Sequence, residues 1–243
     1  MRFSIKYSLL ALLAMGSAAQ ASFLVINLPG TSTQGNWAGM TAANYPGYPT
    51  FFTTNSPWPN PIAQTSGTGG MSLNKTSGNG FPSNGGGIYS AGNVPGGGSY
   101  AISAPTALTS LETIVFQLEI EGLGSNWTSV ASGISLNYNG GSQALAPGFS
   151  QLISSTPLPP QFGQPANRFY VAYQWDLSSI ASISSWQLNY NASEHSIARA
   201  IQINQGDTYA AIPEPSTWAL LGIAAGTLLA GRRNRRKEHD SCA

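Results

Sequence analysis

Apolar and polar residues alternate with a period of two through much of the C-terminal half of the chain. In residues 113–121, Ile114, Phe116, Leu118 and Ile120 share one side, and mostly polar residues share the other. This alternation predicts a strand with one face in a core and one in solvent. Asn139-Gly140 predicts a tight hairpin turn. The same period recurs in residues 134–138, 168–177, 186–190 and 198–203.

The N-terminal half is less regular. Residues 23–28 predict a first strand that ends at Pro29-Gly30. The many Gly, Pro, Ser and Asn residues in ranges 36–60 and 67–98 predict loops there. Short strands at most are expected near residues 88–89 and 99–104. Because no long amphipathic helix interrupts the strands, we expect an all-β fold, an antiparallel β-sandwich with a jelly roll as one candidate topology.

The first residues have the pattern of a secretory signal peptide. Arg2 and Lys6 precede an apolar run over residues 7–15, and Ala19-Gln20-Ala21 has the small side chains that signal peptidase reads. We therefore expect residues 1–21 to be removed by cleavage after Ala21. An uncleaved anchor is disfavoured because the apolar run is short.

The tail, residues 211–243, combines two prolines, an apolar run and a basic end. Pro213 and Pro215 flank Glu214 and prevent a helix from starting earlier. A membrane helix is expected at about residues 217–231, although the core of this run gives only about 20 Å of helix against about 30 Å of hydrocarbon. A buried core helix is disfavoured by the cytoplasmic-type basic cluster that follows. That cluster is Arg232, Arg233, Arg235, Arg236 and Lys237.

Ile212-Pro213-Glu214-Pro215-Ser216, the apolar run and the Arg-rich end resemble the PEP-CTERM sorting signal of Gram-negative bacteria. The resemblance covers about the last thirty residues. It implies that an exosortase cuts near Pro-Glu-Pro, after transient anchoring in the inner membrane. It also implies a final location at the cell surface or in the extracellular matrix, and a link to exopolysaccharide and biofilm. Ile212 replaces the commoner Val, and residues 238–243 extend past the usual end.

Composition narrows the function of the exported body, residues 22–210. Charged residues are 8% of the chain, with 28 Gly and 16 Pro. The body has three basic and six acidic residues, a net charge of −3, which argues against nucleic-acid binding. Cys242, the only cysteine, lies in the tail, so the body has no disulfide. We expect no metal and no cofactor, since His195 has no second histidine in the body.

Four polar residues are candidates for chemistry. Glu119 and Glu121 share one strand face at a spacing that would suit a glycosidase pair or a Ca²⁺ site, but solvated acids on an outer face explain them more simply. Asp176, His195 and a serine would form a hydrolase triad if they met. The simpler interpretation is a turn-capping Asp and a structural or surface His, since no Gly-x-Ser-x-Gly motif is present.

Aromatic residues at 37–58 are the candidate glycan-binding surface, because such rings stack on sugars. The alternative is that they cover one end of the core. We expect an exported surface or matrix protein with a structural, adhesive or exopolysaccharide-associated role, and no assigned catalytic residue. The competing class is a secreted hydrolase acting on polysaccharide or peptide. The candidate rings are Trp37, Tyr45, Tyr48 and Trp58.

Overall fold

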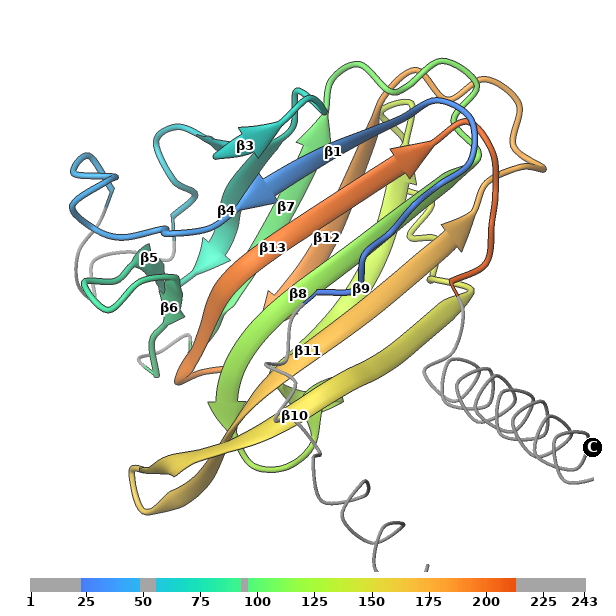
Figure 1. Cartoon of the computed structure of the whole chain (residues 1–243). Helices are drawn as coiled ribbons and strands as arrows, with labels where there is room; N and C mark the ends of the chain where they lie inside the picture. The colour runs from blue at the N-terminus through green and yellow to red at the C-terminus, as the bar shows by residue number, and fades with distance from the viewer. Residues whose placement is uncertain (1–22, 49–55, 93–95, 213–243) are drawn as a thin grey trace, which may run out of the picture.

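The computed structural model describes residues 23–48, 56–92 and 96–212, which form two antiparallel β-sheets packed as a sandwich (Figure 1). The predicted all-β sandwich is confirmed. Helix in the described residues is limited to the four-residue α2 (Trp127–Val130). Within those three ranges no helix has the length and hydropathy of a membrane span. The predicted signal peptide, residues 1–21, and the predicted membrane helix, residues 217–231, lie outside the described residues.

The larger sheet has eight strands in the described part of the chain. Its order is β10-β11-β8-β13-β1-β3, and β6 pairs with both β13 and β5. The long central strands β8, β11 and β13 pair over most of their length. The strands are β1 (Ser32–Trp37), β3 (Ser66–Gly67), β5 (Gly80–Pro82), β6 (Ile88–Ser90), β8 (Thr113–Leu123), β10 (Phe149–Gln161), β11 (Gln164–Asp176) and β13 (Ser196–Gly206).

The smaller sheet has five strands in the same described ranges, with the order β2-β4-β7-β12-β9. The chain crosses between the sheets repeatedly, since β8, β10, β11 and β13 lie in the larger sheet and β9 and β12 in the smaller. Such crossing is typical of Greek-key sandwiches. The strands are β2 (Ile62–Ala63), β4 (Ser72–Gly78), β7 (Gly98–Ala104), β9 (Ala131–Tyr138) and β12 (Trp186–Ala192).

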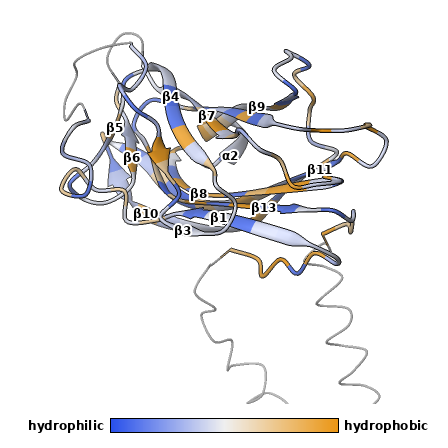
Figure 2. Ribbon diagram, turned by 90° about the horizontal axis from the view of Figure 1, so that it is seen from above, coloured by the Kyte–Doolittle hydropathy of each residue, from blue (hydrophilic) through white to orange (hydrophobic). Residues whose placement is uncertain are grey.

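The core lies between the sheets, as the alternation predicts. Ile114, Phe116, Leu118 and Ile120 of β8 are all fully buried. The alternate residues of β11 and β12 join them in one continuous cluster. Each large apolar side chain buried in this way stabilises the fold by about 1.5–3 kcal/mol. The view along the sandwich shows apolar residues gathered between the two layers (Figure 2).

The opposite side of β8 was expected in solvent, and this expectation is wrong. Gln117 is 0% exposed and Glu121 is 4% exposed. Gln117 is covered because the segment around Leu24 crosses the outer face and bonds to its side chain. Glu121 is covered by the side chains of two arginines. A period-two pattern cannot reveal covering by segments distant in sequence.

The predicted first strand, residues 23–28, is also wrong. This segment has no strand pairing, and the place beside β13 belongs to the polar strand β1. Between residues 67 and 98 the chain is more regular than expected, because β4 pairs with β7 despite its polar sequence. The strands expected near residues 88–89 and 99–104 are confirmed as β6 and β7. The proline-rich β10 was not predicted; it lies at the sheet edge, where proline is tolerated.

The turn predicted at Asn139-Gly140 is confirmed. Asn139 has φ 52° and Gly140 has φ 69°, as a type I′ turn requires, and the Gly141 N–H donates to the Tyr138 carbonyl at 2.9 Å. The returning arm pairs with β9 only through the bridge between Leu136 and Leu145. The hairpin is therefore much shorter than the turn signal alone suggests.

Candidate functional site

The four aromatic residues predicted to bind glycan pack into or against the core. Trp37 is 0% exposed and Trp58 is 4% exposed, and their indole N–H groups donate to backbone carbonyls at 3.1 and 2.9 Å. Tyr45 and Tyr48 are partly buried, and their rings continue edge to face toward Trp58. A buried indole offers no open face to a sugar, so packing accounts for Trp37 and Trp58.

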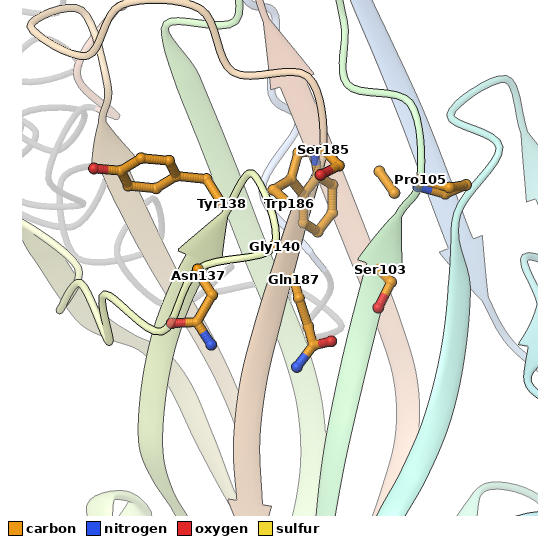
Figure 3. A pocket seen from close by; sticks show the side chains of 10 residues that line it. Ser103, Pro105, Asn137, Tyr138, Gly140, Ser185, Trp186 and Gln187 are labelled. Atoms are coloured by element: carbon orange, nitrogen blue, oxygen red, sulfur yellow. The ribbon is translucent and has the colours of Figure 1, made fainter.

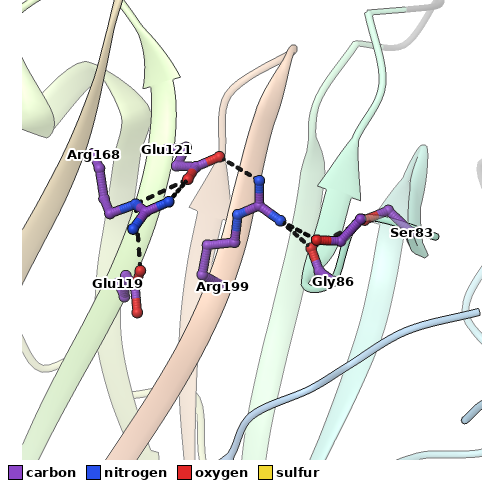
Figure 4. A network of polar contacts seen from close by, with 7 residues as sticks. Ser83, Gly86, Glu119, Glu121, Arg168 and Arg199 are labelled. Carbon is purple, nitrogen blue, oxygen red and sulfur yellow. Dashed lines mark hydrogen bonds and ion pairs between the residues drawn. The ribbon is translucent and has the colours of Figure 1, made fainter. Parts of the chain in front are cut away.

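Glu119 and Glu121 point toward arginines (Figure 4). Glu121 accepts from the Arg168 Nε at 2.9 Å through one oxygen and from Arg199 at 2.7 Å through the other. Glu119 lies 3.4 Å from Arg168. The interpretation as a solvated acid is therefore wrong for Glu121, which is buried on the larger sheet and forms ion pairs with two arginines.

The electrostatics of this cluster favour a structural role. Burial would raise the pKa of Glu121, but hydrogen bonds and charge from Arg199 and Arg168 outweigh burial and hold the pKa below its ordinary value. Arg199 also donates to the carbonyls of Gly85 and Gly86, both at 2.6 Å. The guanidinium thus ties the loop before β6 to β8 and β13 (Figure 4).

Asp176 and His195 lie far apart. Asp176 ends β11, where its carboxylate accepts from the Ser178 N–H and hydroxyl at 3.0 and 2.6 Å. His195 lies near the opposite end of β11. The centroids of its ring and the Phe162 ring are 4.3 Å apart, and its Nδ1 lies 2.9 Å from the Tyr89 hydroxyl oxygen. A 13-residue strand separates the two places by roughly 40 Å.

The polar candidates therefore do not converge on one site in the described residues: Asp176 lies at one end of β11, and Glu121 and His195 lie toward the other end, each with different partners. Asp176 caps a turn, His195 packs at a loop, and Glu119 and Glu121 hold arginines. Across residues 23–48, 56–92 and 96–212, no three His, Cys, Asp or Glu side chains gather as metal ligands would.

The outer face of the smaller sheet is a broad polar surface that the sequence analysis did not single out. Directly paired residues share a face, so the register places Ser103, Gln187 and Asn137 in one row. The strands of this sheet contain one charged residue, Lys75, and it is 1% exposed. We call this surface the amide face: Ser72, Asn74, Ser99, Ser103, Ser135, Asn137, Gln187, Asn189 and Asn191.

A shallow cavity of about 250 Å³ lies on the amide face, where β9 meets the Asn139-Gly140 turn. Figure 3 shows Asn137, Gln187 and Ser103 projecting from neighbouring strands on the same side. Small-molecule sites usually enclose about 300–1,000 Å³. This cavity therefore suits contact with part of a longer chain better than enclosure of a free ligand.

A sequence signal for the amide face did exist. Ser135 and Asn137 alternate with apolar residues in β9, as Gln187 and Asn189 do in β12. Alternation alone assigns such residues to solvent. Their arrangement in rows depends on the pairing of β4, β7, β12 and β9, which the sequence does not show.

Residues 211–236 match the family model described as the PEP-CTERM protein-sorting motif. The resemblance seen in the sequence is confirmed, and the motif implies an exported protein processed by an exosortase. Comparisons with curated proteins and with solved structures each found no match. The motif residues Pro213, Glu214 and Pro215 lie outside the described residues, as do Ala19 and Ala21 and the basic cluster Arg232, Arg233, Arg235, Arg236 and Lys237.

Proposed function

We propose that this exosortase-sorted protein has a structural or adhesive role at the cell surface or in the extracellular matrix, and that it holds a neutral polysaccharide on the amide face. The supporting observation is the uncharged surface built from paired rows of amides and hydroxyls. Such groups both donate and accept hydrogen bonds, as sugar hydroxyls do.

Charge selects the class of polysaccharide. The amide face has no charged side chain with which to pair a uronate or sulfate group. The exported body has a net charge of −3, which repels a polyanion over longer distances. A neutral chain avoids both costs and can extend across several strands.

Affinity electrophoresis tests this proposal. We expect a gel that contains neutral glucan or galactomannan to slow the protein, and a gel that contains alginate to leave it unaffected. The double variant Asn137→Ala/Gln187→Ala should bind about five- to 150-fold more weakly, because each lost hydrogen bond contributes about 0.5–1.5 kcal/mol.

The matched control is Gln151→Ala, because Gln151 lies on β10 of the other sheet. This variant should be slowed as much as the wild type. Equal binding by the double variant and the wild type would remove the amide face as the site. Binding to alginate alone would overturn the choice of a neutral ligand.

A further inference from the structure

Two buried glutamines on neighbouring strands each hold one end of the described chain. Gln117 of β8 is 0% exposed and Gln174 of β11 is 2% exposed. The register pairs Gln117 with Ala172 and Val115 with Gln174, so the two side chains emerge on the same face of the larger sheet. Both ends of the described chain lie on the outer side of this sheet (Figure 2).

Gln117 holds the N-terminal segment. Its Oε1 accepts from the Leu24 N–H at 2.7 Å, and its Nε2 donates to the Leu24 carbonyl at 3.0 Å. The same Nε2 donates to the Gln202 side chain at 2.6 Å. The carboxamide thus replaces the strand partner that residues 23–28 lack.

Gln174 holds the C-terminal segment in the same way. Its Nε2 donates to the Ala210 carbonyl at 2.7 Å, and its Oε1 accepts from the Ile212 N–H at 2.9 Å. A further bond from Nε2 to the Thr113 hydroxyl, at 3.1 Å, fixes the carboxamide in the sheet. The Gln174 side chain therefore has partners for both its oxygen and its nitrogen.

Apolar packing reinforces the hydrogen bonds. Ile212 is 7% exposed although it is the last described residue. Residues 24–28 and 210–212 line a common groove of about 230 Å³. The chain is therefore held against the body up to the residue that directly precedes Pro213.

We propose that Gln174 is a positioning residue for processing of the tail. Its carboxamide holds the backbone through Ile212, so the exosortase cuts only on the C-terminal side of Ile212 and the mature protein has a defined end. The inference rests on the exosortase processing within the proposed function and is independent of glycan binding.

The physical reason is access to the backbone. An enzyme that cuts a peptide must bind an extended segment whose N–H and C=O groups are free. The Ala210 carbonyl and the Ile212 N–H are both bonded to the Gln174 side chain, so an upstream cut requires local opening first. At the bond that is cut, the carbonyl carbon passes to water or to an acceptor amine, and the released tail leaves with a new, protonated amino terminus.

The full chain tests the inference through two measurements. Hydrogen exchange of the precursor in detergent micelles reports opening at the Ile212 amide. Mass spectrometry of the protein from cells with a working exosortase reports where the mature chain ends. In the wild type we expect a protected Ile212 amide and no mature end before Ile212.

Gln174→Met keeps the length of the side chain and loses its hydrogen bonds, whereas Gln174→Glu keeps an acceptor for the Ile212 N–H. In Gln174→Met we expect about five- to thirty-fold faster exchange at Ile212 and mature ends that spread into residues 209–212. In Gln174→Glu the carboxylate still accepts from the Ile212 N–H but faces the Ala210 carbonyl without a donor, so exchange at Ile212 should also be faster than in the wild type. Gln164→Met, the same change at an exposed glutamine near the opposite end of β11, should match the wild type in both measurements.

Unchanged exchange and an unchanged mature end in Gln174→Met would overturn the inference, as would a wild-type end before Ile212. Faster exchange throughout β12 in both Gln174 variants would show that Gln174 stabilises the whole fold instead, which also overturns a specific positioning role. An uncut wild-type chain would contradict the processing itself, while the exchange data would still report on Gln174.

Discussion

Among single residues, Glu121 should contribute strongly to stability, because it forms ion pairs with both Arg168 and Arg199. Removing one member of a buried ion pair costs about 3–5 kcal/mol, whereas an exposed pair contributes about 0–1 kcal/mol. The Glu121 side chain is 5% exposed, but Arg168 and Arg199 are 37% and 25% exposed. Solvent therefore screens the arginine side of each pair. We expect the cost of removing Glu121 to lie between the values for a buried pair and an exposed pair.

We predict that Glu121→Gln lowers the free energy of unfolding by about 2 kcal/mol at pH 7, because two guanidinium groups lose their anion. Urea titration followed by tryptophan fluorescence measures the change. Glu194→Gln, at an exposed position, is the control and should stay within about 0.5 kcal/mol of the wild type. A loss no larger than that of the control would show that the pairing adds little.

The same variant should change the acid sensitivity of the fold. Because the pKa of Glu121 is lowered in the folded state, its contribution is present above the unfolded value, about 4.5, and is lost as pH falls through the folded value. Stability should thus fall less steeply below pH 4.5 in Glu121→Gln than in the wild type. Some slope should remain, since hydrogen bonds from Ser178 and Thr31 also lower the pKa values of Asp176 and Asp207.

At the scale of elements, local turn chemistry and long-range pairing contribute differently. The Asn139-Gly140 turn forms as its sequence predicts, with both residues at positive φ. The strand expected at residues 23–28 does not form, because β1 pairs with β13 and Gln117 holds Leu24 instead. A turn is determined by two residues, whereas a strand needs a free partner edge.

We predict that Gly140→Ala lowers the free energy of unfolding by about 1 kcal/mol. Gly140 has φ 69°, and a Cβ there would meet no other atom, so the cost comes from the backbone alone. Gly148→Ala is the matched control, since its surroundings are equally open and its φ is not positive. Thermal unfolding of the pair measures the effect, and equal melting temperatures would contradict the argument.

At the scale of the whole molecule, packing has to supply the stability, since the body has no cysteine. A series of ring contacts runs through the sandwich, with centroids 5.0–6.0 Å apart. Such contacts add about 0.5–1.5 kcal/mol per pair beyond the area that they bury. In order, the rings are Trp58, Tyr100, Tyr190, Phe116, Tyr173 and Trp127.

We predict that a reducing agent leaves the melting temperature of the full chain within about 1 °C, because the exported body contains no disulfide to break. Near-UV circular dichroism follows the buried aromatic rings directly during this melting experiment.

Tyr173→Ala should by comparison lower the free energy of unfolding by about 3–5 kcal/mol, as truncation of a large core ring does. A shift of several degrees in the melting temperature on reduction would contradict the claim that packing alone, without a disulfide, stabilises the exported body.

The sorting motif, the all-β class and the strictly alternating strands, such as β8 and β11, could be predicted from the sequence alone. These depend on the order and spacing of nearby residues, which the sequence contains directly. The burial of Glu121, the place of Trp37 and Trp58 in the core, and the contacts of Gln117 and Gln174 with the two ends depend on the three-dimensional fold. The amide face belongs with them, because all of these depend on which distant segments pair and what covers each face.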